Sequence, residues 1–271
     1  MESVITSPKN PLVREVLDLQ GKSKERNLRQ TIVVEGLKEI TLAVSAGVRF
    51  RKVIYRPELI SAEAVRALVA TSAGAGSEFI AVSEAVFAKI SYRESTGGVI
   101  CLAEKPEKQL RDLPVDDRSL FIVLESIEKP GNLGAICRVA DAARVSGVIV
   151  CDPRTDIYNP NAIRSSLGCV FTVDVVSADS ETILNWLRQN GIKSFAAELQ
   201  AADFYHESDL RGRVALVFGT EATGLTDKWI HGADRRIKIP MGGVIDSLNV
   251  TTSVAILVFE AMRQRGFSGN F

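Results

Sequence analysis

Apolar and polar residues follow one another in short blocks along the first hundred residues, in a pattern that predicts a small α/β unit. Short apolar runs indicate strands, and segments with apolar residues at helical spacing lie between them. The expected strands are 31–36, 51–56, 78–82 and 97–103, and the expected helices are 37–47, 62–70 and 83–90.

The second half of the chain opens with a nearly continuous apolar run at 119–126, typical of a parallel strand covered on both faces. Further apolar runs then alternate with helical patterns, which favours a parallel sheet with helices on both sides. The later strands are expected at 147–151, 169–176, 194–199, 214–219 and 235–240, with helices after the first strand, at 180–189 and 225–231, and at the C-terminus.

These blocks predict a division into an N-terminal arm (1–29), a small domain (30–104), a polar linker with two prolines (105–118) and a larger domain (119–271). Residues 21–29 of the arm carry four basic residues against one acid. Such a run is either a solvated helix end or a phosphate-binding segment, and the sequence leaves both interpretations open.

Composition narrows the class of protein. The 271 residues are 46% apolar and 24% charged, with 33 basic and 33 acidic side chains, which counts mildly against a protein that coats nucleic acid non-specifically. The four cysteines form no C-x-x-C pair and there are only two histidines, so we expect no metal site, and Cys101 and Cys151 should act as small hydrophobes. No apolar stretch is long enough for a membrane, which leads us to expect a soluble, cytoplasmic chain.

Three loop-rich segments carry the candidate chemistry, and the first is 129–142. Two glycines flank Asn132 where the strand gives way to a helix, and glycine there lets a backbone approach a ligand closely. Arg138 interrupts the apolar face of that helix. It either pairs with Asp141 on the exposed side or has a functional role.

In the second segment, a buried strand ending at Phe218 opens into a loop from Gly219 to Gly224. The glycines are spaced as in a phosphate-binding P-loop, but Leu225 stands in place of the essential lysine. Because Glu221 would repel phosphate, the loop suits a neutral or cationic ligand such as S-adenosylmethionine, with its sulfonium and amino groups. An ordinary strand–turn–helix with an exposed Glu221 is the alternative.

The third segment runs from Ile239 at a strand end into the last helix. Ser247 is expected to be the N-cap of that helix, with Asn249 bonding locally in its first turn. Residues 254–259 are all apolar, which predicts a helix buried on most sides. Either a subunit interface or a central position in the core would bury it.

Taken together and in this order, the segments resemble the signature motifs of the SpoU/TrmH family, RNA ribose 2′-O-methyltransferases of the SPOUT superfamily. Asn132, Gly134 and Arg138 match the family pattern N-x-G-x-x-x-R. The resemblance covers about 119–265. The front half resembles the small α/β RNA-binding domain, similar to ribosomal proteins, that often precedes the catalytic domain, with 33–40 as its opening motif.

The resemblance implies a C-terminal parallel sheet with a deep trefoil knot, a feature almost absent from other folds. It also implies a homodimer through the C-terminal domain, with residues from both subunits in each site. The implied cofactor is S-adenosylmethionine, and the implied cofactor-binding residues are Phe218, Gly219, Gly224, Ile239, Met241, Leu248 and Asn249.

The implied reaction is in-line methyl transfer to a ribose 2′-oxygen without a metal. The implied catalytic residues are Arg138, Asn132, Glu221, Ser247 and Asn249. A guanidinium stays protonated in proteins, so we expect Arg138 to stabilise the developing alkoxide or to fix an RNA phosphate rather than to act as a base.

The function expected from the sequence is therefore RNA 2′-O-methylation, most readily of ribosomal RNA. Two alternatives keep the same fold: a transfer RNA methyltransferase, and a non-catalytic RNA-binding or ribosome-assembly protein. A nucleotide-binding enzyme of another kind is disfavoured, because no G-x-G-x-x-G follows a strand and the P-loop lysine is missing.

Overall fold

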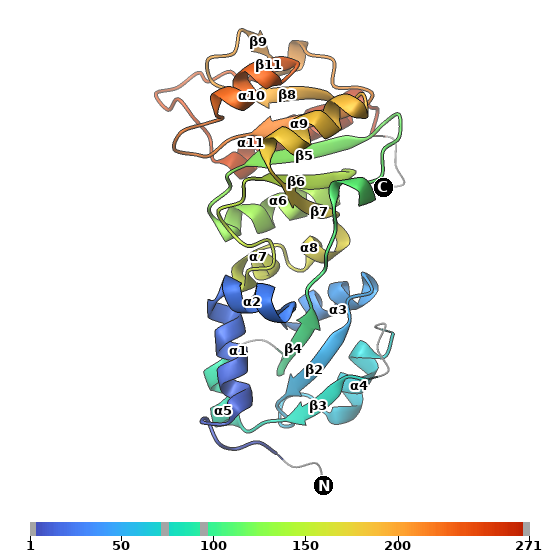
Figure 1. The fold of residues 1–271 in the computed structure, drawn as a ribbon, viewed down its shortest axis with the longest axis vertical. Helices are drawn as coiled ribbons and strands as arrows, with labels where there is room; N and C mark the ends of the chain where they lie inside the picture. Colours follow the sequence, from blue (N-terminus) through green and yellow to red (C-terminus); the bar gives the residue numbers. More distant parts are fainter. Residues whose placement is uncertain (1–3, 72–75, 93–96, 268–271) are drawn as a thin grey trace. The chain divides into compact units, whose positions relative to one another are not determined.

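The computed structural model describes residues 4–71, 76–92 and 97–267 (Figure 1). The chain forms two compact units. Unit 1 consists of residues 1–106 with 156–172, and unit 2 of residues 107–155 with 173–271. The segment 156–172, which the sequence-based division places in the larger domain, thus packs with the N-terminal part of the chain. The predicted domain boundaries themselves stay a prediction.

Unit 1 contains a four-stranded mixed sheet in the order β1-β4-β2-β3. Strand β4 pairs antiparallel with both β1 and β2, and β3 runs parallel to β2. All four strands were predicted from the apolar runs. Their bounds are Thr31–Glu35 (β1), Phe50–Tyr55 (β2), Glu78–Ala81 (β3) and Val99–Glu104 (β4).

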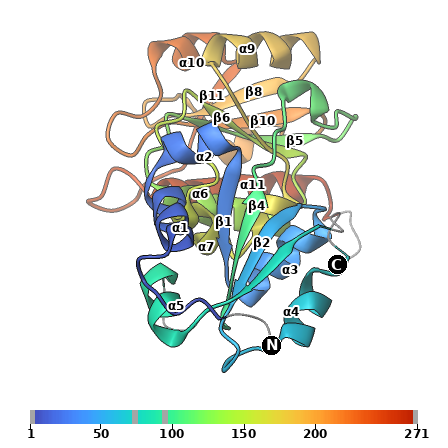
Figure 2. The ribbon, with the colours of Figure 1, turned by 60° about the horizontal axis from the view of Figure 1, so that its bottom comes forward.

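Helices cover both faces of this sheet, α1 and α5 on one side and α3 and α4 on the other (Figure 2). Helix α1 begins where the Asn10 side chain accepts the N–H of Leu12, and it buries one apolar face against the sheet. The predicted N-terminal arm is therefore part of the core of unit 1. The helices are Pro11–Gly21 (α1), Ser23–Arg29 (α2), Leu37–Ser45 (α3), Ala62–Val69 (α4) and Glu84–Ile90 (α5).

The inserted segment contributes α7 (Pro160–Ser165) and α8 (Cys169–Thr172), which contact β1 and α3 respectively. The predicted strand 169–176 is wrong at its start, because residues 169–172 are helical. Leu167 and Gly168 have positive φ, and the Ser166 hydroxyl accepts the N–H groups of Gly168 and Val170. These local bonds begin a helical turn and override the strand preference of the apolar side chains.

Unit 2 contains a seven-stranded sheet in the order β7-β6-β5-β10-β8-β11-β9, and every pair of neighbours is parallel. Strand β10 lies between β5 and β8, so the strand order reverses beside β5. Ligands of open α/β sheets bind at such a point, outside the carboxyl ends of the strands. The bounds are Leu120–Glu125 (β5), Gly147–Cys151 (β6), Val175–Ala178 (β7), Lys193–Ala197 (β8), Asp203–Phe204 (β9), Val214–Phe218 (β10) and Arg235–Lys238 (β11).

Figure 2 shows α9 and α10 on one face of this sheet and α6 and α11 on the other. Trp229 of α10 is fully buried, and its indole N–H donates to the Ser180 hydroxyl at 3.1 Å. Leu113 of the predicted linker also joins this core. The helices are Pro130–Ala142 (α6), Ser180–Gln189 (α9), Asp227–Gly232 (α10) and Val250–Gln264 (α11), with 3-10 turns at Leu110–Asp112 and Tyr205–Glu207.

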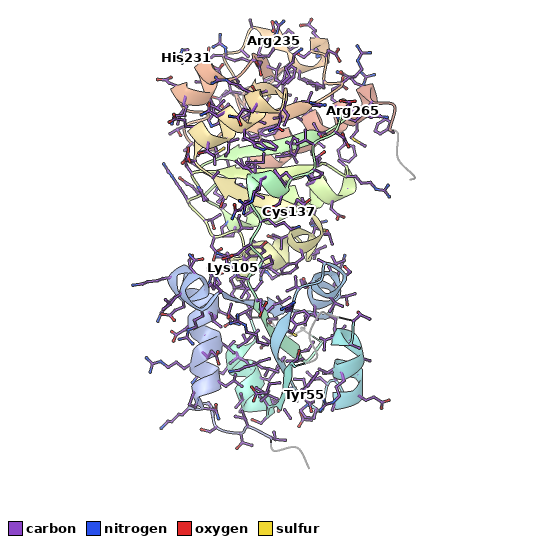
Figure 3. All side chains as sticks on the ribbon, turned by 45° about the vertical axis from the view of Figure 1, so that its right-hand side comes forward. Tyr55, Lys105, Cys137, His231, Arg235 and Arg265 are labelled. Atoms are coloured by element: carbon purple, nitrogen blue, oxygen red, sulfur yellow. The ribbon has the colours of Figure 1, made fainter. Side chains whose placement is uncertain are left out.

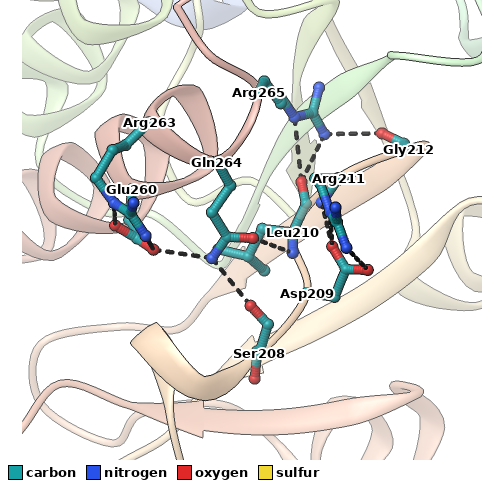
Figure 4. A network of polar contacts seen from close by, with 9 residues as sticks. All are labelled: Ser208, Asp209, Leu210, Arg211, Gly212, Glu260, Arg263, Gln264 and Arg265. Atoms are coloured by element: carbon teal, nitrogen blue, oxygen red, sulfur yellow. Dashed lines mark hydrogen bonds and ion pairs between the residues drawn. The ribbon is translucent and has the colours of Figure 1, made fainter.

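The C-terminal end of α11 is anchored by a polar network (Figure 4). The Gln264 side chain accepts the N–H of Leu210 at 2.8 Å, and Arg265 donates to the carbonyls of Leu210 and Gly212. The helix is thereby fixed to the loop that precedes β10. Its N-terminal end, which carries the third segment, is held against the same unit.

The cysteines are all free thiols, and Cys137 lies buried on α6 (Figure 3). Burial raises the pKa of the Cys101 and Cys151 thiols, as suits small hydrophobes. Within the described residues no helix is long and apolar enough to cross a membrane, and no His, Cys, Asp and Glu side chains gather as a metal site would require.

Candidate active site

The carboxylate of Glu221 joins the three loop-rich segments. Its Oε1 accepts the side-chain amide of Asn132 at 2.9 Å and that of Asn249 at 2.5 Å. Its Oε2 accepts the ammonium of Lys129. Residues from the starts of α6 and α11 therefore meet on one side chain of the loop after β10. Glu221 is exposed, as the alternative interpretation expected, but its side chain is hydrogen-bonded to both neighbouring segments.

The loop that carries Glu221 is a tight turn closed by its own backbone. Thr220 and Gly224 exchange N–H···O bonds of 3.1 and 3.0 Å, and the hydroxyls of Thr220 and Thr223 lie 2.8 Å apart. A Cβ on Gly219 would stand 2.1 Å from the carbonyl carbon of Gly224, so only glycine fits there. The turn thus presents backbone to the adjoining cavity.

A second carboxylate, that of Glu125 at the end of β5, holds the residue Thr226 just after this loop. It is buried, and it accepts the N–H of Thr226 at 2.8 Å and the Thr226 hydroxyl at 2.6 Å. In a P-loop, the hydroxyl at this position of the motif binds the metal ion. Here the Thr226 hydroxyl donates to Glu125 instead. Sequence reasoning missed Glu125, although an acid that ends a buried apolar strand is itself a signal.

The third segment corrects one prediction. The N-cap of α11 is Asn249, not Ser247, because the Asn249 Oδ1 accepts the N–H of Thr251 at 3.0 Å and the helix begins at Val250. The same amide donates to Glu221 through Nδ2. Asn249 therefore fixes the start of the helix and the loop after β10 at once.

A cavity of about 540 Å³ lies beside Glu221, at the carboxyl ends of β8, β10 and β11. Its volume is that of a small-molecule site. Ser247 and Glu221 of the expected catalytic set line it. So do six of the seven expected cofactor-binding residues: Phe218, Gly219, Gly224, Ile239, Met241 and Leu248.

Arg138 stands apart from this cavity. It is exposed on α6 and is not among the lining residues. Within the described part of the chain it has no hydrogen bond or ion pair, so the alternative in which it pairs with Asp141 is not what the structure shows. Its guanidinium is available to a molecule that reaches the exposed side of α6 from outside.

The electrostatics of the site depend on the state of Glu221. Hydrogen bonds from Lys129 and then Asn132 hold the pKa of this carboxyl below its ordinary value, against a smaller opposing effect of desolvation. The ionised carboxylate accepts bonds only, so both asparagines must turn their NH₂ groups toward it. Lys129, which sequence reasoning did not select, is therefore part of the site.

The fold and the site define a parallel α/β protein with a ligand cavity at the carboxyl ends of its strands β8, β10 and β11. The chain belongs to the SpoU rRNA Methylase family, whose model matches residues 119–259. Residues 10–101 match the MRM3-like substrate binding domain. The resemblance stated from the motifs is thus confirmed, as is the parallel α/β sheet preceded by a small N-terminal domain.

Relatives align with nearly the whole chain. It is 28% identical to the 23S rRNA (uridine(2479)-2′-O)-methyltransferase of Streptomyces viridochromogenes, over 91% of this chain and 88% of that protein. It is 26% identical to the 23S rRNA (guanosine(2553)-2′-O)-methyltransferase RlmP of Bacillus subtilis, over 94% and 98%. The crystal structure of an AdoMet-bound rRNA methyltransferase from Sinorhizobium meliloti superposes with a TM-score of 0.87 at 30% identity, covering 96% of this chain and 97% of that one.

Proposed function

We propose that this protein transfers a methyl group from S-adenosylmethionine to a ribose 2′-oxygen of ribosomal RNA. The observation that carries the proposal is the meeting of Asn132, Glu221 and Asn249 beside the cavity. Family membership and the ribosomal RNA methyltransferases among the relatives support it. The two named relatives act on a uridine and a guanosine, so we assign no base.

The cavity suits the proposed methyl donor. Its charged lining residues are Glu198, Glu221 and Asp246 against Lys238, a balance that favours a cationic ligand over a phosphate. Gly219 allows the ligand to approach the backbone of the turn. When bound, S-adenosylmethionine supplies a methyl group already activated by its positive sulfur.

The side chains of this chain would then position the acceptor. Asn132 and Asn249, oriented by Glu221, hold the start of α6 and the start of α11 in fixed places. Placing the reacting groups correctly contributes about 7–11 kcal/mol to such reactions. As the S–CH₃ bond breaks and S-adenosylhomocysteine leaves, the 2′-hydroxyl releases its proton to solvent, and Arg138 stabilises the negative charge on the 2′-oxygen or binds the neighbouring phosphate.

We extend the proposal to the homodimer and the trefoil knot expected from the family. The exposure of Arg138, away from the cavity of its own chain, supports a site completed by a second copy. Phe259 on α11 is 41% exposed, so a second subunit could bury it. The insertion of β10 between β5 and β8 is compatible with a knotted C-terminal segment. A cytoplasmic location belongs to the same proposal, because the substrate is ribosomal RNA.

The test compares wild-type protein with Arg138→Ala. We expect the variant to bind S-adenosylmethionine in calorimetry as the wild type does, and to lose methyl transfer by at least about 100-fold, as when a group that stabilises charge in the transition state is removed. Arg211→Ala, which removes an exposed guanidinium paired with Asp209, is the matched control and should keep its activity.

Mapping 2′-O-methyl sites in total RNA, with and without the protein, then identifies the substrate. Equal activity of Arg138→Ala and wild type would contradict the assignment of Arg138. Binding of RNA without any binding of S-adenosylmethionine would favour the non-catalytic ribosome-assembly protein, and a site in transfer RNA would favour the other alternative.

A further inference from the structure

Four charged side chains line the cavity, and they differ in how much of their hydrogen-bonding capacity is already used. Both oxygens of Glu221 are occupied by Lys129 and the two asparagines. Asp246 lies in an exposed loop, where its Oδ1 meets the Ser247 hydroxyl at 3.4 Å. Glu221 is thus already hydrogen-bonded and Asp246 lies in an exposed loop, so neither is a fixed and unoccupied acceptor.

Glu198 is different, because the strand fixes it. It directly follows β8, which lies between β10 and β11. Its N–H donates to the carbonyl of Ile237 at 3.0 Å, and its own carbonyl accepts the N–H of Ala201 at 3.2 Å. The backbone is thus held on both sides of the residue, and its side chain is only 14% exposed.

The carboxylate of Glu198 is nevertheless only partly satisfied. Its Oε2 lies 3.5 Å from the guanidinium of Arg236, at the limit of a hydrogen bond, and Arg236 is itself 47% exposed. The residues that the structure describes offer Oε1 no hydrogen bond. Oε1 is therefore open to accept from whatever fills the cavity, and a bound ligand can supply the donor.

We infer that Glu198 binds the ribose hydroxyls of the methyl donor, an assignment that rests on the proposed function. A vicinal diol presents two donors to the two oxygens of one carboxylate. An acid after a strand of an open α/β sheet makes this contact with the ribose of dinucleotides. The structure thereby assigns a specificity-determining residue for a ribonucleoside, as opposed to a deoxynucleoside, in the donor.

The α-amino group of the donor is the competing partner for Glu198, and the charges disfavour it. Arg236 and Lys238 lie two apart on β11, so their side chains leave the same face of the sheet. Arg236 is within 4 Å of Glu198, and Lys238 lines the same cavity. A third cation would meet these two charges, whereas neutral hydroxyls would not.

The experiment measures, by calorimetry, the binding of S-adenosylhomocysteine and of its 2′,3′-dideoxy analogue to the wild-type protein and to Glu198→Met. The wild type should bind the dideoxy analogue about 10- to 100-fold more weakly, as expected when bonds to a charged acceptor are lost. Glu198→Met should bind both nucleosides with the same reduced affinity. Glu181→Met, the same change at an exposed position of α9, should keep the full discrimination.

Each other outcome has a distinct meaning. A Glu198→Met variant that still discriminates between the two nucleosides would overturn the assignment. That result would be expected if Glu198 bound only the amino group of the donor or only held Arg236 in place. A wild type that binds both equally would also overturn the assignment. A wild-type protein that binds neither nucleoside would contradict the proposed function and, with it, the assignment.

Discussion

At the scale of single residues, the ammonium of Lys129 controls the charge state of the carboxylate on which the site depends. Its hydrogen bond is the largest of the effects that lower the pKa of Glu221. If Glu221 were protonated, it would lose the ionic bond from Lys129 and the charge that strengthens the bonds from both asparagines, so the common anchor of α6 and α11 would weaken. Methyl transfer should therefore fall as the pH falls through the pKa of Glu221.

Lys129→Met removes this ammonium and should raise the pKa of Glu221 toward its ordinary value. The acidic limb of the rate profile should accordingly move to higher pH. Well above that limb the rate should fall by less than about tenfold, because exposed ion pairs contribute about 1 kcal/mol or less. The measurement is kcat as a function of pH.

Two variants control the Lys129 experiment. Lys129→Arg keeps a cation beside Glu221 and should restore the acidic limb, whereas Lys228→Met removes an exposed lysine of α10 and should leave the profile unchanged. An acidic limb that stays in place in Lys129→Met would show that Glu221 does not set it.

Gly219 gives a second prediction at this scale. Any Cβ there would overlap the backbone of Gly224 and Leu225 at 2.1–2.4 Å, so Gly219→Ala must open the turn. We expect the affinity for S-adenosylhomocysteine to fall about 10- to 100-fold, given the usual cost of 1–3 kcal/mol for overpacking. Gly131→Ala, where a Cβ would meet nothing within 4 Å, should bind normally. Equal affinities of the two variants would contradict a role for this turn in binding.

At the scale of elements, helix α2 tests, at Arg26, the two interpretations of the basic run 21–29: a solvated helix end or a phosphate-binding segment. Arg26 is neither solvated nor free for phosphate. It is 1% exposed, donates to Asp156 at 2.6 Å, and also donates to the carbonyls of Leu19 and Gln20. The pair fixes α2, the end of α1 and the inserted segment 156–172 within unit 1.

Arg26→Met should lower the free energy of unfolding of unit 1 by about 3–5 kcal/mol, because it leaves a buried carboxylate without its partner. Arg29→Met breaks an exposed pair with Glu25 in the same helix and should cost less than about 1 kcal/mol. The measurement is urea denaturation. If Arg26→Met does not fold, Arg26→Met/Asp156→Leu, which removes both charges, should recover stability. Similar effects of Arg26→Met and Arg29→Met would contradict the argument.

The elements also indicate what a sequence can predict. Long apolar runs such as 119–126 predicted buried strands, because burial on both faces leaves few polar positions. Cys169–Thr172 and the cap of α11 were predicted wrongly, since single side-chain bonds from Ser166 and Asn249 decide them. The bonds to Glu221 span 28 to 92 residues, and no local pattern reports such a distance.

At the scale of the whole molecule, the two units are connected by more than the predicted linker. The chain passes between them near 106, again near 155, and once more near 172. Residues 156–172 lie within the stretch that matches the methyltransferase family, yet they pack with unit 1. Removal of residues 1–106 would therefore uncover the buried side chains of α7 and α8, so unit 2 is not a simple C-terminal fragment.

The proposed dimer predicts that two inactive variants regain activity when they exchange subunits. Arg138→Ala and Glu221→Ala should each be inactive alone. If Arg138 of one subunit serves the cavity of the other, a heterodimer of the two variants contains one site with both residues intact. An equal mixture, allowed to exchange subunits, should then regain about a quarter of wild-type activity, because half of the dimers in a symmetric exchange are heterodimers with one active site of two. Mass spectrometry of differently tagged subunits verifies the exchange. An exchanged mixture without activity would place Arg138 and Glu221 of the same subunit in one site.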